Sequence, residues 1–416
     1  MRKYLIIVAV LLLAAGCSGR KVKIGETLPV WKEGELDIHF INCGKGECTY
    51  QILPDGTTFL VDASGSLLKF GVMASDPLPM RPWDGITPGQ VISDYIRQFE
   101  PSCSEGHINY MLITHYDSDH IGSCNASLPL HESGEFRLSS LAEIGSNLVI
   151  DNFFDRSYPT YDYPTDAYMA SKTNLPNYWA FLDWTQRENG TVRAAWDAGS
   201  HSQIVPLYKP DCVTVQAYSG NGRFWTGEGE ESEQLLPTKE EFETGPEAGV
   251  PVENAFSCSY ILTYGDFDFF LGGDLQVNDR SNFPYKDVEA PVARKAHKVE
   301  VMKANHHGTS NTNDTLIMSV LRPDVWVCSN WRTVQPKPAT IDRVIAANPS
   351  CDIFCTNMPK ENVPILGEDR LSRIDSQWGH VVVRVGRGGH SYMVYSLDDG
   401  DQEYTVKSIH GPYSCE

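Results

Sequence analysis

The pattern of apolar and polar residues predicts two strand-rich parts of the chain with a less regular region between them. In the first part, the alternation at residues 36–41 is typical of a half-buried strand, and the spacing at 91–99 is helical. Pro54-Asp55-Gly56 is typical of a hairpin turn. The strands predicted in this part cover residues 36–41, 50–53, 57–62 and 110–114.

The second part begins near residue 258 and alternates strands with helices. A hairpin over 258–271 is predicted to turn at Gly265-Asp266. Strands, then alternating helices and strands, then strands again predict a layered α/β sandwich over residues 35–400, followed by a C-terminal tail at 401–416. The later strands are predicted at 299–304, 324–329, 351–356, 380–385 and 391–395, and the helices at 314–321 and 341–347.

Residues from about 125 to 250 differ from both parts. They are rich in Tyr, Trp, Asn, Asp and Pro, and their periodicity is weak. This pattern predicts an insertion of long loops with some local structure, and such loops commonly shape substrate pockets. We interpret the acidic run at 228–233 as a solvated loop.

The N-terminus has the organisation of a bacterial lipoprotein signal. Arg2 and Lys3 precede an apolar run at 5–15, and Gly16-Cys17 follows, which is typical of a secretory signal with a small-residue cleavage site. The apolar run is too short to span a bilayer as a helix. We expect a signal peptide over 1–17, lipidation of Cys17, a tether over 18–34, and an extracytoplasmic protein anchored to the membrane. An ordinary signal peptide with a chance cysteine is the alternative.

Charge and cysteine content narrow the classes of function. The formal net charge is −20, and so acidic a surface argues against binding to long duplex nucleic acid while suiting divalent cations. The cysteines include no Cys-x-x-Cys pair, so a cysteine-based zinc site is not expected. Cys43, Cys258 and Cys328 lie in apolar runs and are predicted to be buried thiols.

Four potential metal ligands follow the strand predicted at 110–114. They are His115, Asp117, Asp119 and His120, and Gly122 permits a tight turn after them. A loop that leaves a strand end can direct alternate side chains into one cavity, and imidazole and carboxylate groups both bind first-row divalent metals. The motif therefore predicts a metal site.

This motif resembles the signature loop of the metallo-β-lactamase superfamily. Asp117 in the second ligand place resembles the form found in ComEC-type β-lactamase-like domains. The resemblance implies a metallo-β-lactamase αββα sandwich over residues 35–400, with 125–250 as an expansion of this chain. Other segments that resemble this subgroup, in family order, are 40–47, 253–257, 271–275 and 302–309.

The resemblance also implies roles for individual residues. His115 and Asp117 would bind one divalent metal, and Asp119 and His120 a second, with Asp119 also close to the attacking water. Asp274 would bridge the two metals. The remaining implied residues are His306 or His307 completing the second site, Asp62 orienting the ligands, Asn254 or Ser257 near the place of a third ligand histidine, and Lys303 neutralising an anionic substrate.

Two of these assignments leave alternatives open. His307 is favoured over His306 because it directly precedes glycine, as related ligands do, and Lys303 is alternatively a lysine whose stem is buried at a strand end. The chain also departs from the family pattern in two places. No clear third histidine follows the motif, with His201 a candidate by position only, and Gln335-Pro-Lys337-Pro stands where the family often has two histidines.

A ligand set rich in carboxylates determines which metals and reaction we expect. Fewer nitrogen ligands shift the preference from zinc towards manganese or magnesium. We therefore expect two divalent ions, Mn²⁺ or Zn²⁺, with Mg²⁺ as a further candidate. A metal-activated water needs no serine or cysteine nucleophile, so the predicted reaction is hydrolysis, although the fold does not choose the bond.

The leading hypothesis is a phosphodiesterase or nuclease-like activity on a small molecule or a short, single-stranded nucleic acid, because carboxylate-rich ligation suits phosphate chemistry. One alternative is hydrolysis of a lactam, a lactone or another ester. A second is a non-catalytic surface binding protein that keeps structural metals. No stable protein partner is implied, and a complete DNA-uptake channel is not expected because its many membrane spans are absent from the sequence.

Overall fold

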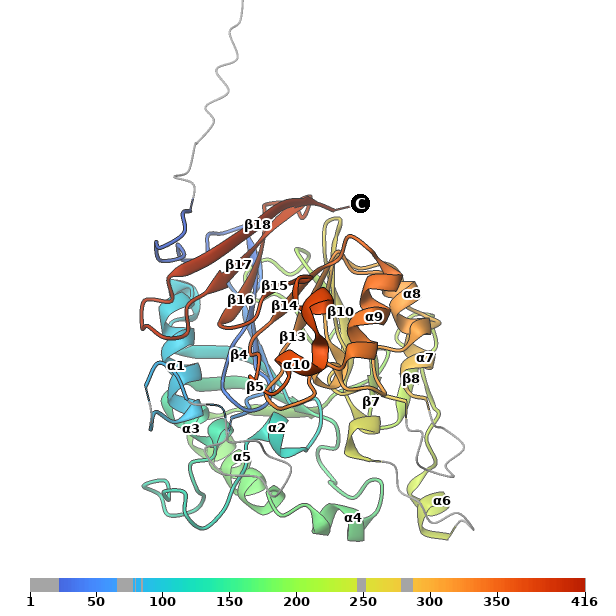
Figure 1. Ribbon diagram of the computed structural model, residues 1–416. Helices are drawn as coiled ribbons and strands as arrows, with labels where there is room; N and C mark the ends of the chain where they lie inside the picture. Colours follow the sequence, from blue (N-terminus) through green and yellow to red (C-terminus); the bar gives the residue numbers. More distant parts are fainter. Residues whose placement is uncertain are drawn as a thin grey trace, which may run out of the picture.

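Two mixed sheets face each other, and helices cover the outer face of each (Figure 1). The computed structural model of the protein describes residues 22–65, 78, 80–83, 85–244, 252–277 and 287–415. Within them, the predicted αββα sandwich is confirmed. The predicted signal peptide, with Cys17, and residues 18–21 of the predicted tether lie outside the described residues. None of the described helices is both long and apolar enough to cross a membrane.

The first sheet combines an antiparallel half with a parallel half. The strands from β18 to β3 pair antiparallel, whereas β3 to β6 run parallel to one another. In spatial order the strands are β18 (Val406–Ser414), β17 (Ser391–Leu397), β16 (His380–Val385), β1 (Leu36–Phe40), β2 (Thr49–Ile52), β3 (Thr58–Val61), β4 (His107–Leu112), β5 (Val149–Asp155) and β6 (Val192–Ala195).

The second sheet repeats this division. Strands β11 to β15 are parallel, and the continuous apolar sequence of the central strand, Val325–Cys328, fits a strand that is buried on both faces. The strands from β9 to β11 pair antiparallel. In spatial order the strands are β15 (Ile374–Ser376), β14 (Asp352–Cys355), β13 (Val325–Cys328), β12 (Val301–Lys303), β11 (Phe267–Leu271), β10 (Ser259–Tyr264), β7 (Thr214–Gly220), β8 (Arg223–Trp225) and β9 (Ser232–Gln234).

The core consists of three apolar layers. The middle layer lies between the sheets, where the rings of Phe40 and Phe269 meet edge to face with centroids 5.9 Å apart. The outer layers lie between each sheet and its helices. Cys258 is buried in the middle layer, and Cys43 and Cys328 are buried in the outer layers, which confirms their prediction as core thiols.

The helices on the first sheet are α1 (Pro88–Phe99), α3 (Ser140–Asn147) and α5 (Leu175–Asn189), and those on the second are α7 (Glu289–Ala293), α8 (Thr315–Leu321) and α9 (Pro338–Ala347). The Thr87 side chain accepts a hydrogen bond from the Gln90 amide and Pro88 occupies the first turn, so α1 begins three residues before the predicted 91. Shorter helices are α2 (Ser118–Ile121), α4 (Asp166–Ser171), α6 (Lys239–Thr244), α10 (Val363–Leu366), α11 (Glu368–Leu371) and the 3-10 turns η1 (Ser102–Ser104), η2 (Glu253–Phe256) and η3 (Asn305–Gly308).

Two regions hold more regular structure than predicted. Residues 125–250 contribute strands to both sheets, and α5 packs on the first sheet. The half-buried Trp179 and Trp184 on α5 lie outside its fully buried face and obscure the helical period. Residues 401–416 do not form a tail, because 406–414 is the edge strand β18. The side chains of this strand are mostly half-buried or exposed, so its apolar alternation is weak.

A buried ion pair joins β1 to β16. Asp37 and Arg384 are opposite residues in the strand register, and the guanidinium donates two hydrogen bonds to the carboxylate at 2.8 and 2.5 Å. Burial alone would raise the pKa of Asp37, but the adjacent Arg384 lowers it from 3.8 to about 2. Because this pKa is lower in the folded state, the pair stabilises the fold above about pH 4, and the contribution is lost as the pH falls towards 2.

We predict that Arg384→Met destabilises the protein by about 3–5 kcal/mol at pH 7, because it leaves the Asp37 carboxylate buried and unpaired. The free energy of unfolding, measured by urea denaturation, checks this. The matched control is Arg187→Met, because Arg187 forms ion pairs on the surface with Glu135 and Glu188 and should contribute little. Equal effects of the two substitutions would contradict the prediction.

Candidate metal centre

The residues predicted to bind metal lie at the carboxyl ends of parallel strands. His115–His120 follow β4 and Asp62 follows β3, its parallel neighbour. Asp274 follows β11, and the His306-His307 pair follows β12, again a parallel neighbour. Parallel pairing places the loops after neighbouring strands at one edge, and the two sheets bring their edges together. Segments that are distant in the sequence therefore form one cluster.

The carboxylate of Asp274 is the centre of this cluster. Its Oδ2 atom lies near an Nε2 atom of each of four imidazoles. The distances are 3.9 Å to His115, 3.3 Å to His120, 3.7 Å to His306 and 3.6 Å to His307. His307 Nε2 also lies 3.4 Å from Asp119 Oδ2.

Three of these imidazoles are anchored through their other nitrogen. Nδ1 of His120 lies 2.8 Å from Asp62, Nδ1 of His307 lies 2.7 Å from the Ser329 carbonyl, and Nδ1 of His115 lies 3.1 Å from the Thr114 hydroxyl. The Nε2 atoms of all three are buried and make no hydrogen bond within the described residues. Since a buried polar atom without a partner is costly, these nitrogens are arranged for a ligand.

The donor set fits a divalent cation. Asp119, His120, Asp274 and His307 each offer a ligand atom, and these atoms all lie within 4.8 Å of one another. Two imidazole nitrogens and two carboxylates are suitable ligands for zinc or manganese. The candidate roles predicted for these four residues are therefore compatible with the geometry.

Asp62 lies behind the candidate ligands and contacts His120 and Thr114. One of its oxygens accepts from the Thr114 amide at 2.8 Å, and the other contacts both the Thr114 hydroxyl and His120 Nδ1 at 2.8 Å. This arrangement directs His120 Nε2 towards Asp274. Asn254 and Ser257 also lie close, with Asn254 Nδ2 3.2 Å from His306 Nε2 and the Ser257 hydroxyl accepting from the Asp274 amide at 3.1 Å.

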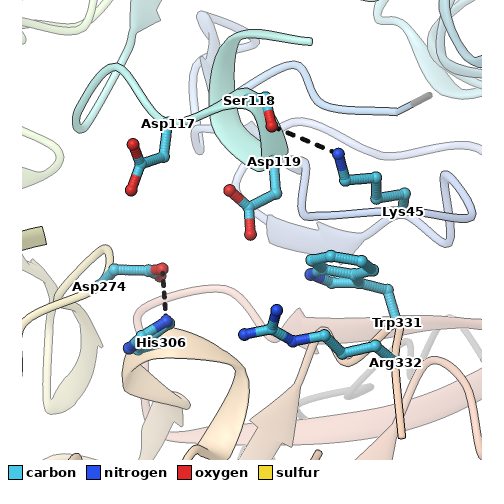
Figure 2. Close-up of a pocket in the computed structure, with 8 residues that line it drawn as sticks. All are labelled: Lys45, Asp117, Ser118, Asp119, Asp274, His306, Trp331 and Arg332. Atoms are coloured by element: carbon cyan, nitrogen blue, oxygen red, sulfur yellow. Dashed lines mark hydrogen bonds and ion pairs between the residues drawn. The ribbon is translucent and has the colours of Figure 1, made fainter. Parts of the chain in front are cut away.

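The histidine pair adopts an uncommon backbone conformation. His306 and His307 both have positive φ, at 45° and 51°. Such φ values are uncommon outside glycine and persist only where the surroundings impose them. Through this turn both imidazoles reach Asp274, so the choice between the two predicted ligands is not exclusive. His307 belongs to the four-ligand group, and His306 faces Asp274 from the pocket side (Figure 2).

Nearby carboxylates control the charge of the imidazoles. Burial alone would lower the pKa of His120 and of His307, but Asp274 and other carboxylates reverse this effect and raise both pKa values. The pKa of His115 remains well below its usual value because burial dominates. A metal bound at this cluster would replace protons on His120 and His307, so we expect its affinity to rise with pH.

Asp117 is less available than the other predicted ligands. Its Oδ1 accepts a hydrogen bond from Lys172 Nζ at 2.8 Å, and its Oδ2 lies 3.9 Å from His115 Nε2. Lys172 also lies 3.5 Å from Glu253, which forms a buried ion pair with Arg156. At the predicted first metal position, formed by His115 and Asp117, the carboxylate of Asp117 is therefore already paired with Lys172, a residue of the 125–250 region.

One predicted assignment is wrong, and the candidate named by position alone lies outside the site. Lys303 does not face a substrate, because its side chain is fully buried and its Nζ donates to both oxygens of Glu47, at 2.5 and 2.7 Å, and to the Gly273 carbonyl. Its charge compensates Glu47, so the lysine is held inside the protein instead of at a strand-end surface. His201 is exposed and lies 3.6 Å from Glu230, outside the cluster.

A pocket of about 280 Å³ opens over the cluster (Figure 2). Asp117, Asp119, Asp274 and His306 line one side of it. The residues of the other side were not predicted from the sequence; they are Lys45, Ser118, Trp331 and Arg332. Two signals could have indicated them: Lys45 lies in the glycine turn at 42–47, and Trp331-Arg332 follows the carboxyl end of β13.

Comparison with known proteins adds no assignment of family. No protein-family model and no curated protein matches the sequence. Three similar solved structures are a protein from Parabacteroides distasonis described as a metal-dependent hydrolase, the metallo-β-lactamase fold protein YhfI from Bacillus subtilis, and CmlA, a diiron beta-hydroxylase from Streptomyces venezuelae.

All three similarities are weak. The sequence identities are 11%, 9% and 12%, and the TM-scores 0.33, 0.35 and 0.38. The alignments cover 80%, 86% and 86% of this chain, and 97%, 98% and 55% of the other chains. Similarities at this level do not identify an activity, so the proposals below depend on the site itself.

We predict that adding Mn²⁺ or Zn²⁺ to metal-free protein raises its stability by about 2–3 kcal/mol when the free metal exceeds its Kd about 100-fold. Asp274→Ala and His307→Ala should abolish this gain, because each removes a ligand from the group of four. Thermal unfolding and elemental analysis after dialysis measure the effect. The control is His297→Ala, which removes an exposed histidine paired with Asp268. A full gain in His307→Ala would place the metal elsewhere.

We also predict that Lys172→Gln increases the amount of metal bound at saturation, because it frees Asp117 from its ion pair. The metal-to-protein ratio should approach two in the variant and stay lower in the parent protein. Lys239→Gln is the matched control, since Lys239 also joins two carboxylates, Asp162 and Asp166, in the same region. Identical ratios in all three proteins would show that Lys172 does not limit metal binding.

Proposed function

We propose that this chain is a metal-dependent hydrolase of the metallo-β-lactamase superfamily, similar to ComEC-type domains, that cleaves a phosphodiester in a small or single-stranded substrate. One observation carries the proposal: the buried Nε2 atoms of His120 and His307, which make no hydrogen bond among the described residues, lie with the carboxylates of Asp119 and Asp274 at the base of an open pocket. A purely structural cluster would have no need of such a pocket.

The choice of a phosphodiester has two supports. Two of the four candidate ligands are carboxylates, and oxygen ligands favour Mn²⁺ or Mg²⁺. These two ions commonly bind phosphate groups of substrates. The far side of the pocket carries Lys45 and Arg332, so an anionic substrate would meet positive charge there. A neutral lactam or ester would make no use of these cations.

Each side chain has a specific part in this reaction. When bound, divalent ions lower the pKa of water and stabilise the charge of the transition state. Asp119 lines the pocket, where its carboxylate can hold and accept the proton of an attacking water. His120 is kept in place by Asp62, and His307 by the Ser329 carbonyl, so neither needs to reorient during the reaction.

Two alternative functions would use the same site: hydrolysis of a bond other than a phosphodiester, and binding of a ligand without hydrolysis. Hydrolysis of lactams, lactones or other esters would use the same activated water. A binding protein with structural metal would hold the cation and a ligand without turnover. The proposed export and lipid anchoring through Cys17 suit any of the three functions. The partners proposed are the substrate, a small molecule or a short nucleic acid, and the membrane, with no stable protein partner.

We predict hydrolysis of bis(p-nitrophenyl) phosphate that depends on Mn²⁺, followed as released nitrophenolate. Asp119→Asn should lower kcat/KM by about 10²-fold or more, because it removes the group that accepts the proton. His201→Ala is the control and should retain full activity, since His201 lies outside the cluster. Turnover of a lactone or lactam panel, with none of the phosphodiester under Mn²⁺, Mg²⁺ or Zn²⁺, would contradict the proposal.

A further inference from the structure

The wall of the pocket opposite the acidic cluster is cationic. Lys45, Trp331 and Arg332 form it, and we call these three residues the basic wall (Figure 2). Lys45 comes from the loop between β1 and β2, and the other two residues follow β13. The two segments belong to different sheets, and across the pocket from them lie Asp117, Asp119 and Asp274, so the pocket has an acidic side and a basic side.

Arg332 carries a positive charge that makes no ion pair within the described residues. Within the described residues, no carboxylate lies within ion-pair distance of its guanidinium, although the protein has 54 acidic residues and 34 lysines and arginines. The guanidinium lies 5.0 Å from the centroid of the Trp331 ring, which supports it from one side. A planar group with five N–H donors on a pocket wall is suited to a phosphate.

Lys45 adds a second positive charge to the same wall. Its Nζ lies 3.3 Å from the Ser118 hydroxyl, 3.2 Å from the Ser123 hydroxyl and 5.3 Å from the centroid of the Trp331 ring. Burial lowers the pKa of Lys45 to about 8, while the carboxylates of Asp119 and Asp117 oppose this change. The ammonium therefore remains mostly protonated at pH 7.

The basic wall is fixed before any ligand arrives. The side-chain carbonyl of Gln335, which is fully buried, accepts hydrogen bonds from the backbone amides of Trp331 at 3.3 Å and Arg332 at 3.2 Å. Asn330 donates to the Gln335 carbonyl at 2.9 Å. The Trp331 ring meets the His307 ring edge to face at 6.2 Å, which sets the wall against the metal cluster. Such preorganisation reduces the entropic cost of binding.

We propose that Arg332 and Lys45, held by Trp331, form a subsite for a second phosphate group of the substrate, separate from the phosphodiester at the acidic cluster. The substrate class is then a short phosphodiester that carries a terminal phosphate, such as a 5′-phosphorylated oligonucleotide. This inference rests on the proposed function for the position of the cleaved group. The binding of the terminal phosphate itself requires no turnover.

The test measures binding with ligands that cannot be cleaved at the phosphodiester. The probes are dithymidine methylphosphonates with and without a 5′-phosphate, titrated by calorimetry into Mn²⁺-loaded full-length protein. We expect the 5′-phosphate to tighten binding by about tenfold or more, as a charge-assisted bidentate contact does. In Arg332→Gln the two probes should bind almost equally, and Lys45→Gln should reduce the difference. Arg332→Lys should retain part of it.

Three comparisons make the outcome decisive. Arg187→Gln, the matched surface variant, should keep the full difference between the probes. Inorganic phosphate should compete only at concentrations about a hundredfold higher, whereas equal competition would point to a site for free phosphate and overturn the proposal. An unchanged difference in Arg332→Gln, with the variant folded by circular dichroism, would also overturn it. A difference that depends on Arg332 in a protein without hydrolase activity would refute the proposed function alone.

Discussion

The candidate site depends on one buried carboxylate, that of Asp274, which four imidazoles face at 3.3–3.9 Å. This convergence requires both sheets, since His115 and His120 follow β4 of the first sheet while Asp274 and the His306-His307 pair follow β11 and β12 of the second. The layers of the sandwich are therefore the means by which ligands from two sheets reach one point. The positive φ values of the histidine pair show that the backbone accommodates this demand locally.

Much of the architecture was predictable because apolar periods are local. The strands at 36–41, 258–264 and 380–385 alternate or run continuously apolar, and the structure places strands there. The metal motif was predictable for a similar reason, since its ligands lie within six consecutive residues after a strand. In contrast, β18 was interpreted as a tail, because an edge strand with few buried residues has little apolar pattern. Strands β6, β8 and β9 within 125–250 were also not predicted, because they are short and have few fully buried residues.

The ion-pair partners of Lys303 and Lys172 were not predictable. Lys303 matched a family motif, but Glu47, which neutralises it, lies 256 positions away. Similarly, nothing around Lys172 indicates that it reaches Asp117 across 55 positions. Charged residues have no period that reveals their partners, so their roles depend on the completed topology. The region 125–250 consequently contributes to the site through Lys172 as well as to the sheets, and its function cannot be separated from that of the domain.

The ion pair between Lys303 and Glu47 has a mechanical consequence. Lys303 ends β12 of the second sheet, whereas Glu47 lies in the loop between β1 and β2 of the first, so the bond fastens one half of the sandwich to the other. Sliding of one sheet past the other would separate the two charges and leave each of them buried without its partner. The halves are thus locked against shear beside the histidines. A cation entering the pocket would therefore meet four donor atoms that the scaffold already holds within 4.8 Å of one another.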